Sequence, residues 1–294
     1  MVRGGTIKGA LFMSSANVSF CAMACMVKYV SHLNIYTTTL FRFLVGMGIM
    51  GLLAMSGRIS LSFVNKPALF ARGLMGGASI AISFLSIAKM GLIKAGIIIQ
   101  LYPMFAAIFG WVLLKERLSI GAMLSIIGSF GGVCLLLTDH PGAGFVSPGI
   151  GLYEVIALFG ALLGGLTVVL VKKLQSTDST PAIFFAQCLI GFWIVLIPAS
   201  IDTGSISLNA SLVLVAIGIC ATVGQLLSTD SYRYLSIATG SALVMIMPLL
   251  TSIAGMALFH ERLGVQGYLG AAIVIASMAG ALWKNGESNA KRRI

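Results

Sequence analysis

The sequence predicts an all-α polytopic membrane protein in which ten transmembrane helices form two inverted five-helix repeats. Of the 294 residues, 58% are hydrophobic and 9% are charged, whereas charged residues make up about a quarter of an ordinary soluble domain. The apolar residues also form long blocks of about 20 residues, the length that a helix needs to cross the hydrocarbon core. In addition, one such block near the middle of the first half of the chain occurs again in the second half.

The repeated stretch covers residues 95–118, AGIIIQLYPMFAAIFGWVLLKERL, and its second copy covers residues 240–263, GSALVMIMPLLTSIAGMALFHERL. Each copy is an apolar segment of spanning length that carries a proline near its first third and ends in Glu-Arg-Leu. Pro103 and Pro248 are 145 residues apart, and so are the two glutamates. One half of the chain is therefore a relative of the other half, and the prolines should bend the fourth helix of each half.

The first apolar block follows basic residues, as the core of a signal peptide would, but it is long and lacks an Ala-x-Ala cleavage site. It is therefore interpreted as the first span.

Pairs of glycines four residues apart in the third, fifth and sixth spans are typical of helices that approach each other closely in lipid. The spans of the first half are predicted at 9–27, 35–55, 69–88, 95–114 and 120–138, and those of the second half at 149–171, 182–201, 208–229, 235–259 and 264–283.

A break rich in Gly and Pro separates the two sets of spans and indicates a linker. The predicted organisation is a first repeat over 1–138, a linker over 139–148, a second repeat over 149–283 and a basic tail over 284–294. Because each repeat has an odd number of spans, the second enters the membrane from the opposite side. Inverted repeats of this kind are common in secondary transporters.

The positions of Lys and Arg predict the orientation. With a cytoplasmic N-terminus, fourteen of these residues fall in inside segments and four in outside segments. Both termini are therefore expected to be cytoplasmic, in a multi-pass protein of the plasma (inner) membrane. The same distribution argues against nucleic acid as a partner despite the formal charge of +11, because a nucleic-acid binder gathers its basic residues in patches.

The residues also resemble a known family. Arg42-Phe43 in the second span, Arg72-Gly73 at the start of the third and the two Pro…Glu-Arg-Leu copies are similar to the EamA-type members of the drug/metabolite transporter superfamily. The resemblance covers the chain from about Lys8 to Trp283. It implies a ten-helix alternating-access carrier with a central cavity, which different members use for amino acids, nucleotide-linked compounds, cofactors or drugs.

The sequence departs from the family pattern after the fourth span of each half. Many relatives have Gly-Glu there, whereas this chain has Lys115-Glu116 and His260-Glu261. The glutamates are retained. Glu116, Arg117, Glu261 and Arg262 are expected either to gate the two faces or to act as structural clasps that satisfy helix-end carbonyls.

Polar side chains within the spans are the candidates for substrate contact, because such residues are costly in lipid and usually face the interior. Gln100 is one turn before Pro103 and beside Tyr102, where the bent helix frees a backbone carbonyl. The alternative for Gln100 is a hydrogen bond to a neighbouring helix. The predicted substrate-binding residues are Asn17, Gln100, Tyr102, Gln225, Met245 and Arg42.

Three charged residues in or near the spans have a structural and a functional interpretation. Glu154 is the candidate for proton coupling, or it is stabilised by the helix dipole at a helix N-terminus. Arg42 and Arg72 invite an anion site, since a guanidinium can fork onto carboxylate or phosphate. However, Arg42 is also within reach of the outer surface, and Arg72 is interpreted chiefly as a cytoplasmic topology anchor.

Enzyme motifs are missing from the sequence, and so are motifs for nucleotide hydrolysis. The five cysteines lie within apolar blocks and predict no disulfide framework or metal site, and no cofactor is expected. The predicted function is a secondary-active or facilitative exporter of small polar organic metabolites such as amino acids, acting in the lipid bilayer as a monomer or homodimer. One alternative is an exchanger of nucleotide-linked or phosphorylated metabolites, which is disfavoured because the predicted spans lack paired Lys and Arg. Another alternative is a non-transporting scaffold or lipid-handling protein.

Overall fold

A computed structural model of the protein describes residues 2–90, 95, 98–116, 120–138, 151–201, 206–259 and 264–290. All regular secondary structure in these ranges is α-helical, as the sequence predicts. The predicted linker over 139–148 lies outside the described residues. The helices are α1 (Val2–Tyr29), α2 (Ile35–Met55), α3 (Lys66–Met90), α5 (Tyr102–Leu114), α6 (Ile120–Thr138), α7 (Leu152–Leu174), α8 (Thr180–Ser200), α9 (Leu208–Ser231), α10 (Ile237–Val244), α11 (Met247–Phe259) and α12 (Val265–Ala290).

Most of the predicted spans correspond to one helix each, and α2 and α6 have the predicted bounds. The start of α7 is three residues later than predicted because Gly151, with extended backbone, is its N-cap. The span predicted over 235–259 corresponds to the candidate span Ile237–Leu258, which the structure divides into α10 and α11 at Met245 and Ile246. Pro248 explains the division, because it has no N–H to donate to the carbonyl of Val244, the last residue of α10.

Six segments in the described part of the chain are long and apolar enough to cross a membrane: Gly5–Tyr29, Ile35–Met55, Leu152–Leu174, Thr180–Ser200, Leu208–Ser231 and Ile237–Leu258. Shorter apolar helices accompany them. Large apolar side chains such as Leu52, Trp193, Ile197 and Leu212 are exposed on the outside of the bundle. An outward-facing apolar surface is what lipid requires of a membrane helix, since the backbone groups are already satisfied within the helix.

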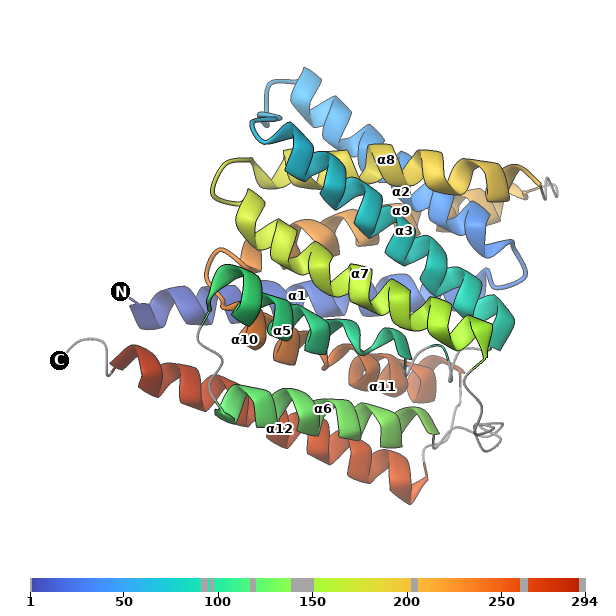
Figure 1. The fold of residues 1–294 in the computed structure, drawn as a ribbon. Coiled ribbons are helices and arrows are strands. Elements are labelled where there is room, and N and C mark those ends of the chain that lie inside the picture. Colours follow the sequence, from blue (N-terminus) through green and yellow to red (C-terminus); the bar gives the residue numbers. More distant parts are fainter. Residues whose placement is uncertain are drawn as a thin grey trace.

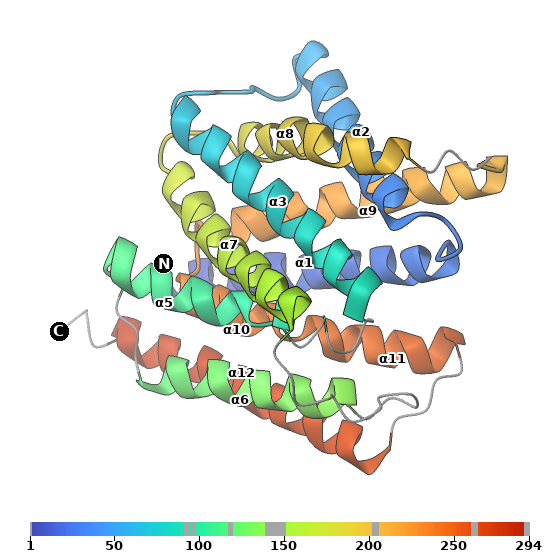
Figure 2. The same ribbon diagram turned by 45° about the vertical axis from the view of Figure 1, so that its right-hand side comes forward.

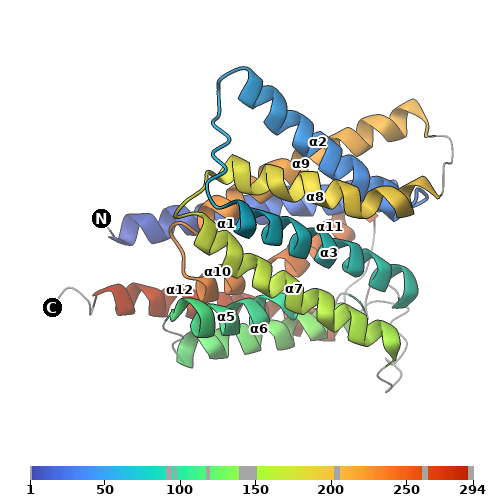
Figure 3. The ribbon, with the colours of Figure 1, turned by 45° about the horizontal axis from the view of Figure 1, so that its top comes forward.

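The closest helix pairings join the first half of the chain to the second half. α1 packs against α9, α3 against α7, α2 against α8 and α6 against α12 (Figure 1). Figure 2 shows the α6–α12 pair side by side beneath α5, α10 and α11. In an exchange of the two halves, α1 takes the place of α7, α2 that of α8, α3 that of α9 and α6 that of α12. The α1–α9 pairing then becomes the α7–α3 pairing, and the α2–α8 and α6–α12 pairings stay the same. The beginning of α1 and the end of α12 lie at the same side of the bundle (Figure 3).

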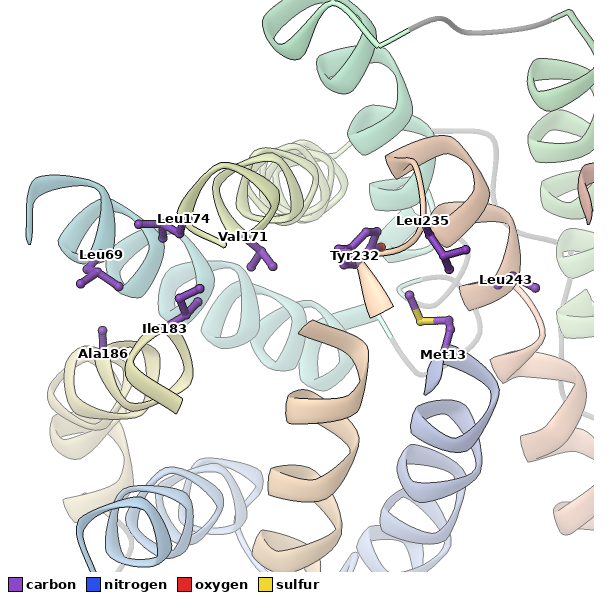
Figure 4. Packing of buried hydrophobic residues seen from close by; sticks show 9 residues of the cluster. All are labelled: Met13, Leu69, Val171, Leu174, Ile183, Ala186, Tyr232, Leu235 and Leu243. Atoms are coloured by element: carbon purple, nitrogen blue, oxygen red, sulfur yellow. The ribbon is translucent and has the colours of Figure 1, made fainter. Parts of the chain in front are cut away.

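A cluster of buried apolar side chains connects the two halves near the chain's first helix. Figure 4 shows Tyr232 between a group from α3, α7 and α8 and a second group that includes Met13 and Leu243. Burying large apolar and aromatic side chains is the main source of packing energy between such elements. The cluster consists of Met13, Leu69, Val171, Leu174, Ile183, Ala186, Tyr232, Leu235 and Leu243.

Close approach of helices depends on several of the paired glycines. A Cβ added to Gly77 of α3 would lie 3.0 Å from the Cα of Gly191 in α8, and one added to Gly132 of α6 would lie 2.7 Å from the Gly270 oxygen in α12. Both neighbours are backbone atoms, which cannot move away as a flexible side chain can. The small residues therefore serve helix packing, as the four-residue spacing predicts.

Candidate functional site

The break between α10 and α11 is stabilised by a side chain from the first helix. The Asn17 Nδ2 group donates a hydrogen bond to the Leu243 carbonyl at 2.9 Å, and both residues are buried. This carbonyl is one of those that end α10 ahead of Pro248. The Asn17 amide adds a side-chain donor to this carbonyl, and such bonds lower the cost of interrupting a helix inside a membrane. The structure therefore places Asn17 at the helix break, as expected of a polar residue that faces the interior.

The corresponding position in the first half is the start of α5. α5 begins at Tyr102 with Pro103 in its first turn. Gln100 lies immediately before it and is half-buried, and the Leu101 N–H donates to the Ile98 carbonyl at 3.1 Å. The helix that carries the repeat is thus interrupted near its proline in both halves, and Gln100 is placed at that interruption.

Tyr102 faces the centre of the bundle. A Cβ added to Gly164 of α7 would lie 3.2 Å from the Tyr102 Cβ, so the absence of a side chain at Gly164 makes room for the tyrosine. Tyr102 also lies close enough to Tyr232, after α9, to interact with it electrostatically. Burial raises the pKa of Tyr232 above its usual range, so its hydroxyl remains neutral. Two tyrosines, one from each half, therefore lie near each other between α7 and α10.

The other predicted contacts lie in different places. Met245, at the helix break, is fully buried against Val133 of α6 and Val274 of α12 and so faces the α6–α12 pair. Gln225 is half-buried in α9. The structure thus places Asn17 and Met245 at the break between α10 and α11. Gln100 and Tyr102 lie at the start of α5. Arg42 lies in a separate cluster.

That second cluster is built around Arg72. Its Nη2 group donates a hydrogen bond to the Gln187 Oε1 atom of α8 at 2.8 Å, and the two residues are 2% and 4% exposed. The other guanidinium nitrogens, Nε and Nη1, have no hydrogen-bond partner among the described residues. Arg42 of α2 lies close enough to Arg72 and to the buried Cys188 to interact with both electrostatically.

This arrangement corrects two statements made from the sequence. Arg72 is a buried partner of α8 and lies about two turns inside α3, so it is not a surface topology anchor. The spans also contain a pair of basic residues, Arg42 and Arg72, where the sequence indicated none. Gly76 makes room for the Arg72 guanidinium in its present position, because a Cβ at residue 76 would lie 2.2 Å from the Arg72 Nη1 atom.

The end of the bundle that carries Glu116 is connected by polar contacts between the halves. The Glu116 Oε2 atom accepts a hydrogen bond from the Ile237 N–H, the first residue of α10, at 2.8 Å. Lys172 of α7 donates to the Tyr232 and Leu235 carbonyls, the latter at 2.6 Å. The sequence analysis counted Lys172 only among the fourteen basic residues of the inside segments. Its position in the last turn of an apolar helix is the one sequence signal of a contact with a neighbouring helix end.

A second set of contacts continues this network to α8 and α9. The Thr180 hydroxyl donates to Asp230 at 2.6 Å and accepts from Arg233 Nη2 at 2.9 Å, while Arg233 and Asp230 form an ion pair at 3.2 Å. The Asp178 carboxylate accepts from the Val64 and Asn65 N–H groups ahead of α3. The acids described at this end are thus engaged in local contacts.

The remaining predicted site residues have the following positions. Glu154 is half-buried in the first turn of α7, and its Oε2 atom would be 2.8 Å from a Cβ added to Gly151. Its carboxylate therefore lies near the N-terminal end of α7, where the helix dipole favours negative charge. Arg117, Glu261 and Arg262 lie outside the described residues. Within the described part of the chain, no group of three or more His, Cys, Asp or Glu side chains is arranged to hold a metal ion.

The fold and these buried polar clusters define an integral, multi-pass helical membrane protein. The sequence model of the EamA-like transporter family matches residues 7–138 and 151–283. The chain belongs to the EamA-like transporter family, which points to transport and not to catalysis.

Two curated relatives and one solved structure illustrate the likeness. The chain is 24% identical over 235 residues to the pseudopaline exporter CntI of Pseudomonas aeruginosa strain UCBPP-PA14, covering 77% of this chain and 78% of the exporter. It is 25% identical, with the same coverage, to the exporter of that name from strain PAO1. A crystal structure of a protein aligns with a TM-score of 0.80 and 16% identity over 93% of this chain and 96% of that one, which shows the fold alone.

Proposed function

We propose that the protein is a secondary-active or facilitative alternating-access transporter that exports small polar organic metabolites such as amino acids or related compounds. Membership of a transporter family and the likeness to an exporter support transport in the outward direction. The observation that carries the proposal is the interrupted fourth helix of each half, at Pro103 and at Pro248. Broken helices with backbone groups held by side chains are typical of transporter binding sites near the bilayer midplane.

The proposed architecture is ten membrane helices in two inverted five-helix repeats, 1–138 and 149–283. The exchange-symmetric helix pairing supports it, because α1–α9 and α7–α3 are equivalent contacts under exchange of the halves. The binding site lies between the halves, where Asn17, Gln100 and Tyr102 supply polar groups. Rocking of one half against the other opens this site to each side in turn.

The protein lies in the plasma (inner) membrane with both termini cytoplasmic, as the distribution of basic residues favours. The start of α1 and the end of α12 lie at the same side of the bundle (Figure 3), which is compatible with this orientation. The partners are a small-molecule substrate and the lipid bilayer, without nucleic acid, and the protein acts as a monomer or homodimer. Glu154 is the proposed proton-coupling residue, because its carboxylate is half-buried within an apolar helix.

Counterflow in proteoliposomes tests the proposal. Purified protein is first screened for thermal stabilisation by a panel of amino acids and related metabolites, and compounds that stabilise it are then loaded into liposomes. Uptake of labelled compound driven by the unlabelled compound inside, and absent from protein-free liposomes, is the expected result. A folded sample that gives no uptake or counterflow of any compound would favour a scaffold or lipid-handling role. Counterflow confined to phosphorylated compounds would favour the nucleotide-linked exchanger.

A further inference from the structure

Arg42 and Arg72 lie on helices that start at opposite ends of the bundle, yet they are close enough to interact electrostatically. Arg42 is seven residues into α2 and Arg72 is six residues into the antiparallel α3, so each lies about 9–10 Å along its helix. α8 packs against both helices and contributes Gln187 and Cys188 between them. The cluster is therefore inside the bundle and is built from three helices of both halves.

The cluster has unused hydrogen-bond donors. Arg72 is 2% exposed, yet only its Nη2 group has a partner, Gln187 Oε1. Its Nε and Nη1 groups have none among the described residues. Nearly all buried guanidinium groups in proteins pair their donors, because unpaired ones cost much of their desolvation energy.

The positive charge of the cluster also lacks a described carboxylate partner. The acids described near the same helices are used elsewhere, since Asp178 holds the backbone ahead of α3 and Asp230 pairs with Arg233. Two guanidinium groups near each other in an apolar surrounding repel one another, and an anion between them relieves this repulsion. The cluster is thus prepared for a negatively charged group that no described residue supplies.

The helices on either side of Arg72 are tightly packed, which favours a flat ligand group. α3 and α8 approach closely on either side of it, because a Cβ at Gly73 would lie 2.9 Å from the Ala186 carbonyl oxygen, and one at Gly77 would lie 3.0 Å from the Gly191 Cα. A carboxylate is planar and matches the planar donors of guanidinium, whereas a phosphate group is tetrahedral and wider. A lipid headgroup at the bundle surface does not contact a side chain that is 2% exposed.

We propose that Arg42, Arg72 and Gln187 form the site that binds the carboxylate group of the transported compound. Gln187 orients the Arg72 guanidinium through Nη2, the remaining Arg72 donors bind the carboxylate, and Arg42 contributes the second charge. The site opens when the halves move apart. This inference rests on the proposed transport function and specifies its substrate class, namely compounds that carry a carboxylate.

Arginine modification tests the site without any need for the natural substrate. The full-length protein in a maltoside detergent is treated with phenylglyoxal, and the rate at Arg42 is measured by peptide mass spectrometry with acetate, acetamide, chloride or inorganic phosphate at equal ionic strength. Acetate is expected to slow modification of Arg42 by about tenfold, the effect of roughly one charge-assisted hydrogen bond. The exposed Arg58 serves as the internal control and should react equally in all four solutions. The proposal would be overturned if Arg42 were modified at equal rates in acetate and acetamide, or if chloride protected Arg42 as well as acetate does. Stronger protection by phosphate than by acetate would show that the site binds phosphate and not carboxylate.

A Gln187→Glu variant separates binding from a purely structural role. The new carboxylate occupies the place of the ligand beside Arg72, so the variant should fold, unfold at a temperature no lower than the parent, and lose the protection by acetate. Retained protection by acetate in this folded variant would contradict the proposal.

Counterflow assays then distinguish failure of this inference from failure of the proposed function. Transport of an amino acid and equal transport of its amide would leave the transporter assignment intact and refute the carboxylate site. No transport of any compound, together with acetate protection at Arg42, would refute the transport function and retain the anion site.

Discussion

The Glu116 carboxylate accepts the backbone N–H of Ile237 at 2.8 Å, so the end of α5 in the first half caps the start of α10 in the second half. This contact joins the fourth helices of the two repeats at the end of the bundle where Lys172 also binds the α9–α10 connection. It supplies the partner of a glutamate that the sequence analysis interpreted as either a gate or a structural clasp. A clasp between helix ends is compatible with a gate as well, since it must part if the halves separate at this end.

Removal of this clasp should weaken the fold. Glu116→Ala leaves the first N–H of α10 without its acceptor and removes a negative charge from a helix N-terminus, at a cost of about 1–3 kcal/mol. We expect a lower thermal unfolding temperature in detergent. Glu116→Gln is the matched control, because its amide oxygen can still accept the Ile237 N–H. Its unfolding temperature should fall by less than that of the alanine variant. An alanine variant as stable as the parent would show that the contact contributes nothing.

The residue before this glutamate is strained in a way that explains the family pattern. Lys115 has φ 53° and ψ 29°, a left-handed conformation at the C-cap of α5. Glycine adopts this conformation without penalty, which accounts for the Gly-Glu of related sequences. Lys115→Gly should stabilise the protein by up to about 1 kcal/mol. The measurement is the unfolding temperature, with Lys173→Gly, in the last turn of α7, as a control that should destabilise. A decrease for Lys115→Gly would contradict this account.

Asn17 should contribute to stability through the helix break. Asn17→Ala leaves the buried Leu243 carbonyl without its side-chain donor, which costs about 1–2 kcal/mol in a membrane protein. Thermal unfolding and counterflow should both be impaired. Val18→Ala, next to it on the exposed side of α1, is the control and should leave transport unchanged. Full transport by the Asn17 variant would exclude a role at the binding site.

Two adjacent glycines of α6 provide a sharp test of the helix packing. Gly132→Ala places a Cβ 2.7 Å from a backbone oxygen of α12, so the helices must separate at a cost of about 1–3 kcal/mol. Gly131→Ala meets nothing within 4 Å and should be neutral or slightly stabilising through helix propensity. Equal unfolding temperatures for the two variants would mean that the α6–α12 pairing differs from the one described.

Substitution of Glu154, the proposed proton-coupling residue, tests how transport is driven. If its carboxylate accepts and releases the coupling proton, Glu154→Gln should abolish transport driven by a pH gradient while exchange between internal and external substrate continues. Both activities are measured in the same proteoliposomes, so loss of exchange would indicate damage to the site and not to coupling. Unchanged dependence on the gradient would assign Glu154 to its local role at the α7 N-terminus.

The sequence predicted the helical membrane class and most helix bounds because these depend on local hydrophobicity and on proline and glycine signals. It also indicated that Asn17 faces the interior. It did not predict the acceptor of Asn17, because the Leu243 carbonyl is available only where α10 ends. The proximity of Arg42 and Arg72 was equally inaccessible, since it depends on how α8 brings two antiparallel helices together. Pairings between helices that are far apart in the chain determine both sites, and local patterns do not report them.

The pairing of first-half helices with second-half helices has a consequence for biogenesis. The principal neighbour of α1 is α9, and that of α3 is α7, so both helices are synthesised before their principal partners in the second half of the chain. During that interval their inward faces, including Asn17 and Arg72, lie in lipid without the contacts that satisfy them in the finished bundle. The hydrogen bonds of Asn17 and Arg72 therefore form only once α10 and α8, which belong to the second half of the chain, are present.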